Sequence, residues 1–89
     1  MSETMPDTVR VFDTWVKGTK GTVHFDVMTT DEATALRLGQ VYLAQIGESA
    51  ATLTTKECQY CHSEPSVMFS AEQQQQLKDN GGFIVPMPA

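Results

Sequence analysis

The chain has 89 residues, of which 40% are hydrophobic and 19% charged, and its formal net charge is −5 at pH 7. This length and composition are typical of one folded domain, so neither a second domain nor wholesale disorder is expected. The basic residues are scattered along an acidic chain, so neither nucleic acid nor an anionic membrane is an expected partner.

The ends of the chain show no recognisable targeting segment. Residues 1–8 are polar and acidic and are expected to form a flexible extension, followed by one domain over residues 9–87 and a short tail at 88–89. A secretory signal is not apparent, and no apolar run reaches the roughly 18–20 residues that span a bilayer. Two cysteines without an export signal are expected to be reduced thiols, which predicts a cytoplasmic protein.

The first two elements are predicted to form a β-hairpin. Residues 9–16 and 22–29 alternate with period two, and the glycines in 17–21 suit a five-residue loop. Pairing Val16 with Thr22 sets the register. The expected core face then carries Val9, Val11, Trp15, Val23, Phe25 and Val27.

The other face of the hairpin is expected to stay open to solvent or to a partner. Its sequence is mixed, and its apolar members are Phe12, Val16 and Met28. In this register Asp13 lies among the core residues, where a buried carboxylate needs hydrogen-bond donors.

A helix is predicted over residues 31–46, because a wide apolar stripe repeats with helical spacing. Thr29 or Thr30 is expected to cap its N-terminus, and Gly47 follows its last turn. Residues 49–52 are read as a loop.

The C-terminal part is predicted to contain a second helix and a last strand. Ser70 and Gln73 fit a capping box that begins a helix to about Asn80, with Gly81 after its end. A short strand over 83–85 follows, and Pro86 is expected to end its pairing.

Residues 58–62 decide whether the sequence contains a metal or thiol site, because they read Cys-Gln-Tyr-Cys-His. This C-x-x-C-H pattern is used for haem c attachment, but the chain lacks the export signal and apolar wrapping that haem c requires, so haem c is disfavoured. The second hypothesis for this segment is a zinc site, with Cys58, Cys61, His62 and His24 as ligands. If neither haem c nor zinc binds, no cofactor is expected.

The backbone conformation of residues 58–62 tests the zinc hypothesis. On a helical turn Cys58, Cys61 and His62 would share one surface, whereas in a regular strand the two cysteines point to opposite faces. The same parity disfavours a redox disulfide. A third strand is needed between the two helices, and this favours the extended form, with His62 on the same face as Cys58.

His24 and Asp26 are predicted to share a strand face, where they could cooperate. A small hydrolase or isomerase that uses Asp13, His24 or Asp26 is a weaker hypothesis, because neither a nucleophile nor a pocket is evident.

Four blocks of sequence together resemble one family. They are Val11–Lys17, His24–Val27, Lys56–Glu64 and Asn80–Ile84, in that order. The combination is similar to the small bacterial proteins of domain of unknown function two-thousand-twenty-four, over about residues 8–87. The resemblance implies a compact α+β domain and supplies no activity. It places Asp13, His24, Cys58, Cys61 and His62 within the family's recognisable motifs, and this chain lacks the final cysteine of some relatives.

The predicted fold is therefore an α+β two-layer sandwich in the order ββαβαβ, with two helices on one face of a mostly antiparallel sheet. A non-enzymatic binding or interaction domain is the preferred function, with a protein partner or a second copy on the open face formed by Phe12, Val16 and Met28. A zinc or thiol site built on Cys58, Cys61 and His62 is the alternative.

Overall fold

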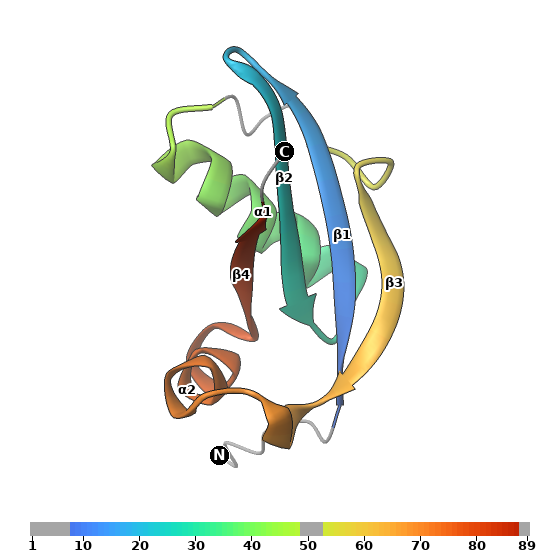
Figure 1. The fold of residues 1–89 in the computed structure, drawn as a ribbon, viewed down its shortest axis with the longest axis vertical. Coiled ribbons are helices and arrows are strands. Elements are labelled where there is room, and N and C mark those ends of the chain that lie inside the picture. The colour runs from blue at the N-terminus through green and yellow to red at the C-terminus, as the bar shows by residue number, and fades with distance from the viewer. Residues whose placement is uncertain (1–7, 49–52, 88–89) are drawn as a thin grey trace.

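The computed structural model describes residues 8–48 and 53–87, and within these ranges the predicted order ββαβαβ is confirmed. The antiparallel sheet has the strand order β3-β1-β2-β4 (Figure 1). The elements are β1 (Thr8–Gly18), β2 (Gly21–Thr29), α1 (Glu32–Gln45), β3 (Cys58–Pro65), the 3-10 helix η2 (Ser66–Met68), α2 (Ala71–Asn80) and β4 (Gly82–Met87). The predicted loop at 49–52, the tail at 88–89 and residues 1–7 of the predicted extension lie outside the described residues.

The hairpin of β1 and β2 differs from the predicted one by a single residue. Val16 pairs with Val23 rather than with Thr22. The pairing continues to Gly18 and Gly21, so the loop has two residues instead of five, and Gly21 adopts a φ of +123° that favours glycine. A shift of one residue changes which β1 side chains share a face with the apolar residues of β2.

The core and open faces of β1 are consequently exchanged over most of its length. Phe12 and Val16, predicted to be open, are 2% and 6% exposed, whereas Trp15, predicted to be core, is 50% exposed. The shifted register places Phe12 and Val16 on the same face as Phe25, beneath α1. The main core consists of Phe12, Val16, Phe25, Val27, Ala35, Leu43, Leu53 and Cys58.

A second apolar cluster lies on the opposite face of the sheet. Its buried members are Val9, Leu77 and Phe83. Phe83 pairs with Met28, which packs against this cluster, whereas the neighbouring Ile84 packs against the main core. α2 therefore covers one end of the face opposite α1. Both helices were expected on one face of the sheet. The placement of α2 differs because its Leu77 packs against Val9 and Phe83.

The N-terminus of α1 is capped by Asp31, the residue directly before the helix, rather than by a threonine. The predicted caps Thr29 and Thr30 are not used, and Asp31 is the N-cap: its Oδ1 accepts the backbone N–H of Thr34 at 2.7 Å. Gly47 follows the helix at a φ of +83°, as its predicted position after the last turn requires. Within residues 8–48 and 53–87, no helix has the length and hydrophobicity needed to span a membrane.

α2 agrees with its prediction at both ends. The Ser70–Gln73 capping box is formed, and Gly81 is left-handed at the C-cap. β4 extends past the predicted end, because Pro86 pairs with Phe25 and the strand reaches Met87. Proline is accommodated there because β4 is an edge strand, in which the nitrogen can face away from the neighbouring strand.

Candidate functional site

Three side chains with cation-binding atoms lie together on the face opposite α1. They are Asp13 of β1 and His24 and Asp26 of β2, and one carboxylate or imidazole atom from each lies within 4.8 Å of the others. They share this face because Asp13 pairs directly with Asp26, and His24 lies two residues before Asp26. In Figure 1, α1 passes behind β1 and β2, and no helix crosses in front of their central parts. We refer to the three residues as the Asp–His–Asp cluster.

Trp15 holds the His24 ring in place. The two rings are stacked, with centroids 3.7 Å apart and an interplanar angle of 12°. The Trp15 indole N–H also donates to Asp13 Oδ2 at 3.0 Å, and His24 Nε2 lies 2.5 Å from Asp13 Oδ1. The imidazole is thus restrained by stacking on one side and by a carboxylate at its edge, and its side chain is only 13% exposed.

The two carboxyl groups of the cluster differ in protonation behaviour. Burial opposes ionisation of Asp13, but hydrogen bonds from Trp15 and His24 outweigh it, so the pKa of Asp13 is lowered. Burial raises the pKa of Asp26, and the hydrogen bond with Asp13 and the Asp13 charge raise it further. Asp13 is therefore the carboxylate that accepts hydrogen bonds, and Asp26 is the group that takes up a proton first.

His62 lies near this cluster on β3 without belonging to it. Its backbone pairs with Val11, so its side chain shares the face of Asp13. His62 Nε2 lies 2.9 Å from Glu64 Oε2, and the His62 side chain is 55% exposed. A positive charge on His62 lowers the pKa of Asp26, although less than burial and Asp13 raise it. Of the predicted metal ligands, His24 and His62 therefore lie on one face.

The structure separates the Cys58, Cys61 and His62 side chains. The extended conformation favoured for this segment is confirmed, since β3 begins at Cys58. Cys58 is fully buried in the main core, on the α1 side. A β-bulge at Cys61 then reverses the alternation, so His62 lies on the face opposite Cys58, and the prediction that they share a face is wrong.

The two thiols lie in different surroundings. Burial raises the pKa of the Cys58 thiol, which disfavours the thiolate that binds metals. Cys61 is exposed, and both cysteines are free. Among the described residues, the metal-ligand group brought together is Asp13, His24 and Asp26 rather than the Cys58–Cys61–His62 set.

The sequence predicts that two of the three residues of the Asp–His–Asp cluster lie together. The shared face of His24 and Asp26 follows from their spacing and is present in the structure. Asp13 was assigned to the core because the hairpin register was wrong by one residue. A two-residue loop between Gly18 and Gly21 would have given the correct register, in which Asp13 lies opposite Asp26. The two glycines are the sequence feature that indicates such a loop.

Comparisons with known proteins support the fold and give no activity. The family model described as a domain of unknown function (DUF2024) matches residues 7–87. No curated protein matches the chain. A solved structure, the NMR structure of protein NE1680 from Nitrosomonas europaea, is similar with a TM-score of 0.74 and 38% sequence identity, over 92% of this chain and 96% of that chain.

Proposed function

We propose that this chain, which belongs to the DUF2024 family, is a non-enzymatic binding domain whose ligand is a divalent transition-metal ion held by Asp13, His24 and Asp26. The observation that carries the proposal is the convergence of one oxygen, one imidazole nitrogen and a second oxygen within 4.8 Å. The cluster replaces the Cys58–Cys61–His62 ligand set suggested by the sequence.

The donor set suits ions such as Zn²⁺. Zn–N bonds are about 2.0–2.1 Å and Zn–O bonds about 2.0–2.2 Å, so ligands of one ion lie about 3–3.5 Å apart in a tetrahedron. The three atoms lie within 4.8 Å of one another, so binding one ion requires the side chains to rotate and bring them closer. Imidazole favours Zn²⁺ over Mg²⁺ or Ca²⁺, which prefer all-oxygen sites.

Electrostatics also favour a cation at this position. Asp13 and Asp26 face one another on two paired strands, and the pKa of Asp26 is raised first by burial and then by the nearby Asp13. A divalent ion between the carboxylates replaces this repulsion with attraction to both. The Trp15 stack and the Trp15–Asp13 hydrogen bond restrain two of the ligands, which reduces the entropy lost on binding.

The surroundings of the cluster support binding rather than catalysis. A groove of about 370 Å³ is lined by α1, α2 and β4, and a smaller one lies beside the hairpin loop. Neither is lined by Asp13, His24 or Asp26. An ion held on this sheet face, outside both grooves, can be exchanged with solvent or shared with a partner.

Calorimetric titration of metal-free protein with Zn²⁺ tests the proposal. We expect one equivalent to bind, and we expect His24→Gln and Asp26→Asn each to weaken binding by about tenfold or more, since each removes a ligand while keeping a similar shape. Cys61→Ala is the matched control and should bind as the wild type does. Circular dichroism verifies that each variant is folded.

Two results would overturn the proposal. One is the absence of stoichiometric binding to the wild type. The other is binding that survives His24→Gln and is lost in Cys61→Ala, which would return the site to the C-x-x-C-H segment.

A further inference from the structure

We propose that the groove between α1, α2 and β4 binds a small neutral heterocycle whose lactam (cyclic amide) edge pairs with the backbone N–H and C=O of Ile84. The groove has a volume of about 370 Å³. Small-molecule sites typically have volumes of about 300–1,000 Å³. The proposal is independent of the cation site, because none of Asp13, His24 and Asp26 lines this groove.

The pattern of backbone hydrogen bonds shows which groups of β4 face away from the sheet. The Trp15 N–H donates to the Glu57 carbonyl at 3.2 Å, on the β3 side of β1. Thr14, one residue earlier, therefore directs its backbone groups toward β2, where it pairs with Phe25. Phe25 in turn directs its groups toward β1, so Pro86, its partner on β4, faces away from β2.

These outward backbone groups of β4 lie along the groove. Gly82 and Ile84 face the same outer side as Pro86, because they precede it by four and two residues. All three residues line the groove. Any ligand in the groove therefore lies beside the outer edge of β4.

Ile84 is the residue of this edge that offers both a donor and an acceptor. Gly82 is buried beneath α1, since a Cβ added there would lie 2.8 Å from Leu38 Cδ1. Pro86 has no N–H. The usable edge is thus one residue long, whereas a partner strand usually pairs through at least about three residues. The occupant that fits is a small molecule rather than a strand.

A lactam is complementary to this single residue. In an antiparallel pair, two opposed residues exchange both N–H···O=C bonds. A lactam carries an N–H beside a C=O, so it can accept from the Ile84 N–H and donate to the Ile84 carbonyl. Among the described residues, no turn, loop or side-chain hydrogen bond occupies these two groups of Ile84.

The walls of the groove are held in place by contacts between the elements that form it. Arg37 Nη2 on α1 donates to the Asn80 carbonyl at the end of α2, at 3.0 Å. Thr29 Oγ1 on β2 donates to the Gly81 carbonyl at 2.6 Å. These bonds fix the end of α2 against α1 and the sheet, so little conformational freedom is lost when a ligand enters.

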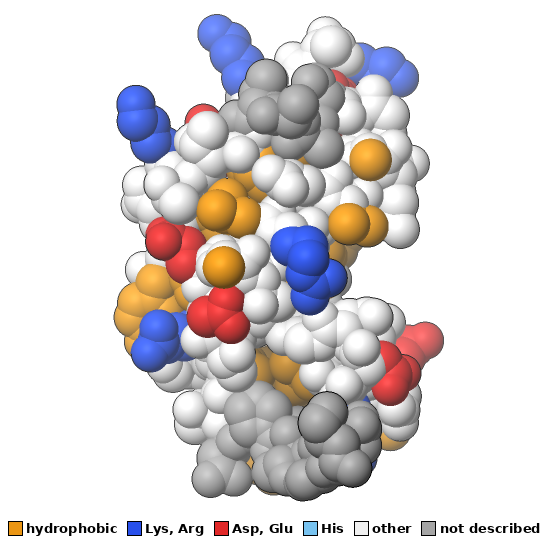
Figure 2. Space-filling view, turned by 180° about the vertical axis from the view of Figure 1, so that it is seen from behind, with side chains coloured by type: hydrophobic (Ala, Val, Ile, Leu, Met, Phe, Trp, Pro, Cys, Tyr) orange, Lys and Arg blue, Asp and Glu red, His pale blue; other side chains and the backbone are white. Residues whose placement is uncertain are grey.

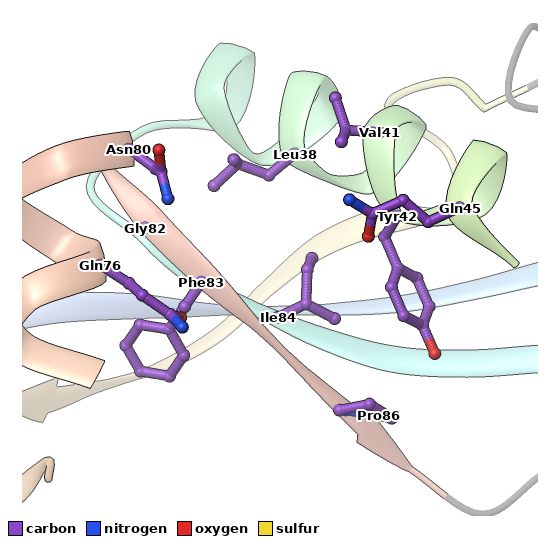
Figure 3. A pocket seen from close by; sticks show the side chains of 10 residues that line it. All are labelled: Leu38, Val41, Tyr42, Gln45, Gln76, Asn80, Gly82, Phe83, Ile84 and Pro86. Atoms are coloured by element: carbon purple, nitrogen blue, oxygen red, sulfur yellow. The ribbon is translucent and has the colours of Figure 1, made fainter. Parts of the chain in front are cut away.

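The lining favours a neutral ligand with an apolar ring. Figure 3 shows Leu38 and Val41 of α1 above β4, with carboxamide side chains from both helices nearby. No residue that lines the groove is charged, whereas the face seen in Figure 2 carries acidic and basic side chains among separate hydrophobic areas. A charged ligand would therefore lose hydration without gaining a counterion, while an apolar ring gains contact with Leu38 and Val41.

An NMR titration of the amide-labelled protein with carbostyril, a neutral bicyclic lactam, tests the proposal. We expect the Ile84 amide resonance to shift with added carbostyril until the shift saturates. N-methylcarbostyril is the matched control, because its methyl group removes the N–H donor and leaves the Ile84 carbonyl unpaired. It should bind about tenfold or more weakly.

Val41 provides a variant that narrows the groove without altering the core. It lines the groove from α1 and is 50% exposed. The larger side chain of Val41→Trp should occupy part of the groove and weaken carbostyril binding about tenfold or more. Val67→Trp is the matched control, because Val67 is 78% exposed on η2 and lies outside the groove. Circular dichroism verifies that both variants are folded.

Three results would overturn the proposal. They are an Ile84 resonance that shows no saturable shift, equal binding of carbostyril and its N-methyl derivative, and carbostyril binding that Val41→Trp leaves unchanged.

Discussion

Replacing Asp26 with asparagine should stabilise the protein without metal, although the same change is expected to weaken metal binding. Asp13 and Asp26 have carboxylate oxygens within 4.8 Å, which corresponds to a repulsion of about 0.9 kcal/mol in water and about 3.5 kcal/mol at an effective dielectric constant of 20. Asp26 is partly exposed, and His24 offsets part of the repulsion, so we take the lower part of this range. The asparagine NH₂ can also donate to the Asp13 carboxylate. We expect the free energy of unfolding at pH 7 to rise by about 1 kcal/mol.

The pH dependence of this gain follows from the raised pKa of Asp26. Above that pKa, Asp26 is ionised in both states and the folded state carries the penalty. As the pH falls through the raised pKa, the folded state takes up a proton, and the penalty disappears below the unfolded value of 3.8. The advantage of Asp26→Asn should therefore be present at pH 7 and shrink toward pH 4.

Urea unfolding of chelator-treated wild type and Asp26→Asn at several pH values measures this difference. Asp79→Asn, which alters an exposed carboxylate on α2, is the control for a general effect of charge. If Asp26→Asn lowered the stability at pH 7 by about 1 kcal/mol, or if its advantage did not depend on pH, the reasoning about carboxylate repulsion would be refuted.

Three further predictions concern packing and thiol chemistry. Gly82→Ala should destabilise the protein by about 1–3 kcal/mol in thermal unfolding, because an added Cβ would lie 2.4 Å from the Met28 carbonyl oxygen; an unchanged melting temperature would contradict this close approach. Leu43→Ala, at a fully buried position of α1, should cost about 2–5 kcal/mol in urea unfolding, and a cost below about 1 kcal/mol would argue against the main core. A thiol reagent should modify Cys61 rapidly and Cys58 only on unfolding, and equal rates would place Cys58 outside the core.

The elements defined by local signals could be predicted from the sequence. The α2 helix is the clearest case, since the Ser70–Gln73 capping box and the glycine at its end are short-range features that the structure reproduces. The N-terminus of α1 was predicted less well, because Thr30 and Asp31 are both good caps and the sequence does not show which one binds Thr34. Helix existence was therefore predictable, whereas the choice between neighbouring caps was not.

The candidate site depended on features that are not local. Glycines at 18 and 21 are compatible with loops of two and five residues, and the choice between them decides whether Asp13 faces the core or His24. The bulge that turns His62 away from Cys58 arises from the pairing of β3 with β1, which the sequence of β3 does not reveal. The one-residue difference in the hairpin register brings Asp13 beside His24 and Asp26, and the bulge in β3 separates His62 from Cys58. The candidate ligands are therefore the two carboxylates and His24 rather than the cysteines.

X-ray absorption of the zinc-loaded protein tests the metal-site proposal most directly, because it identifies the atoms bound to the ion. Ligation by Asp13, His24 and Asp26 predicts a shell of nitrogen and oxygen at about 2.0–2.2 Å, with the outer-shell scattering of one imidazole and no sulfur. Sulfur at about 2.3 Å would contradict the proposal and assign the ion to Cys58 or Cys61.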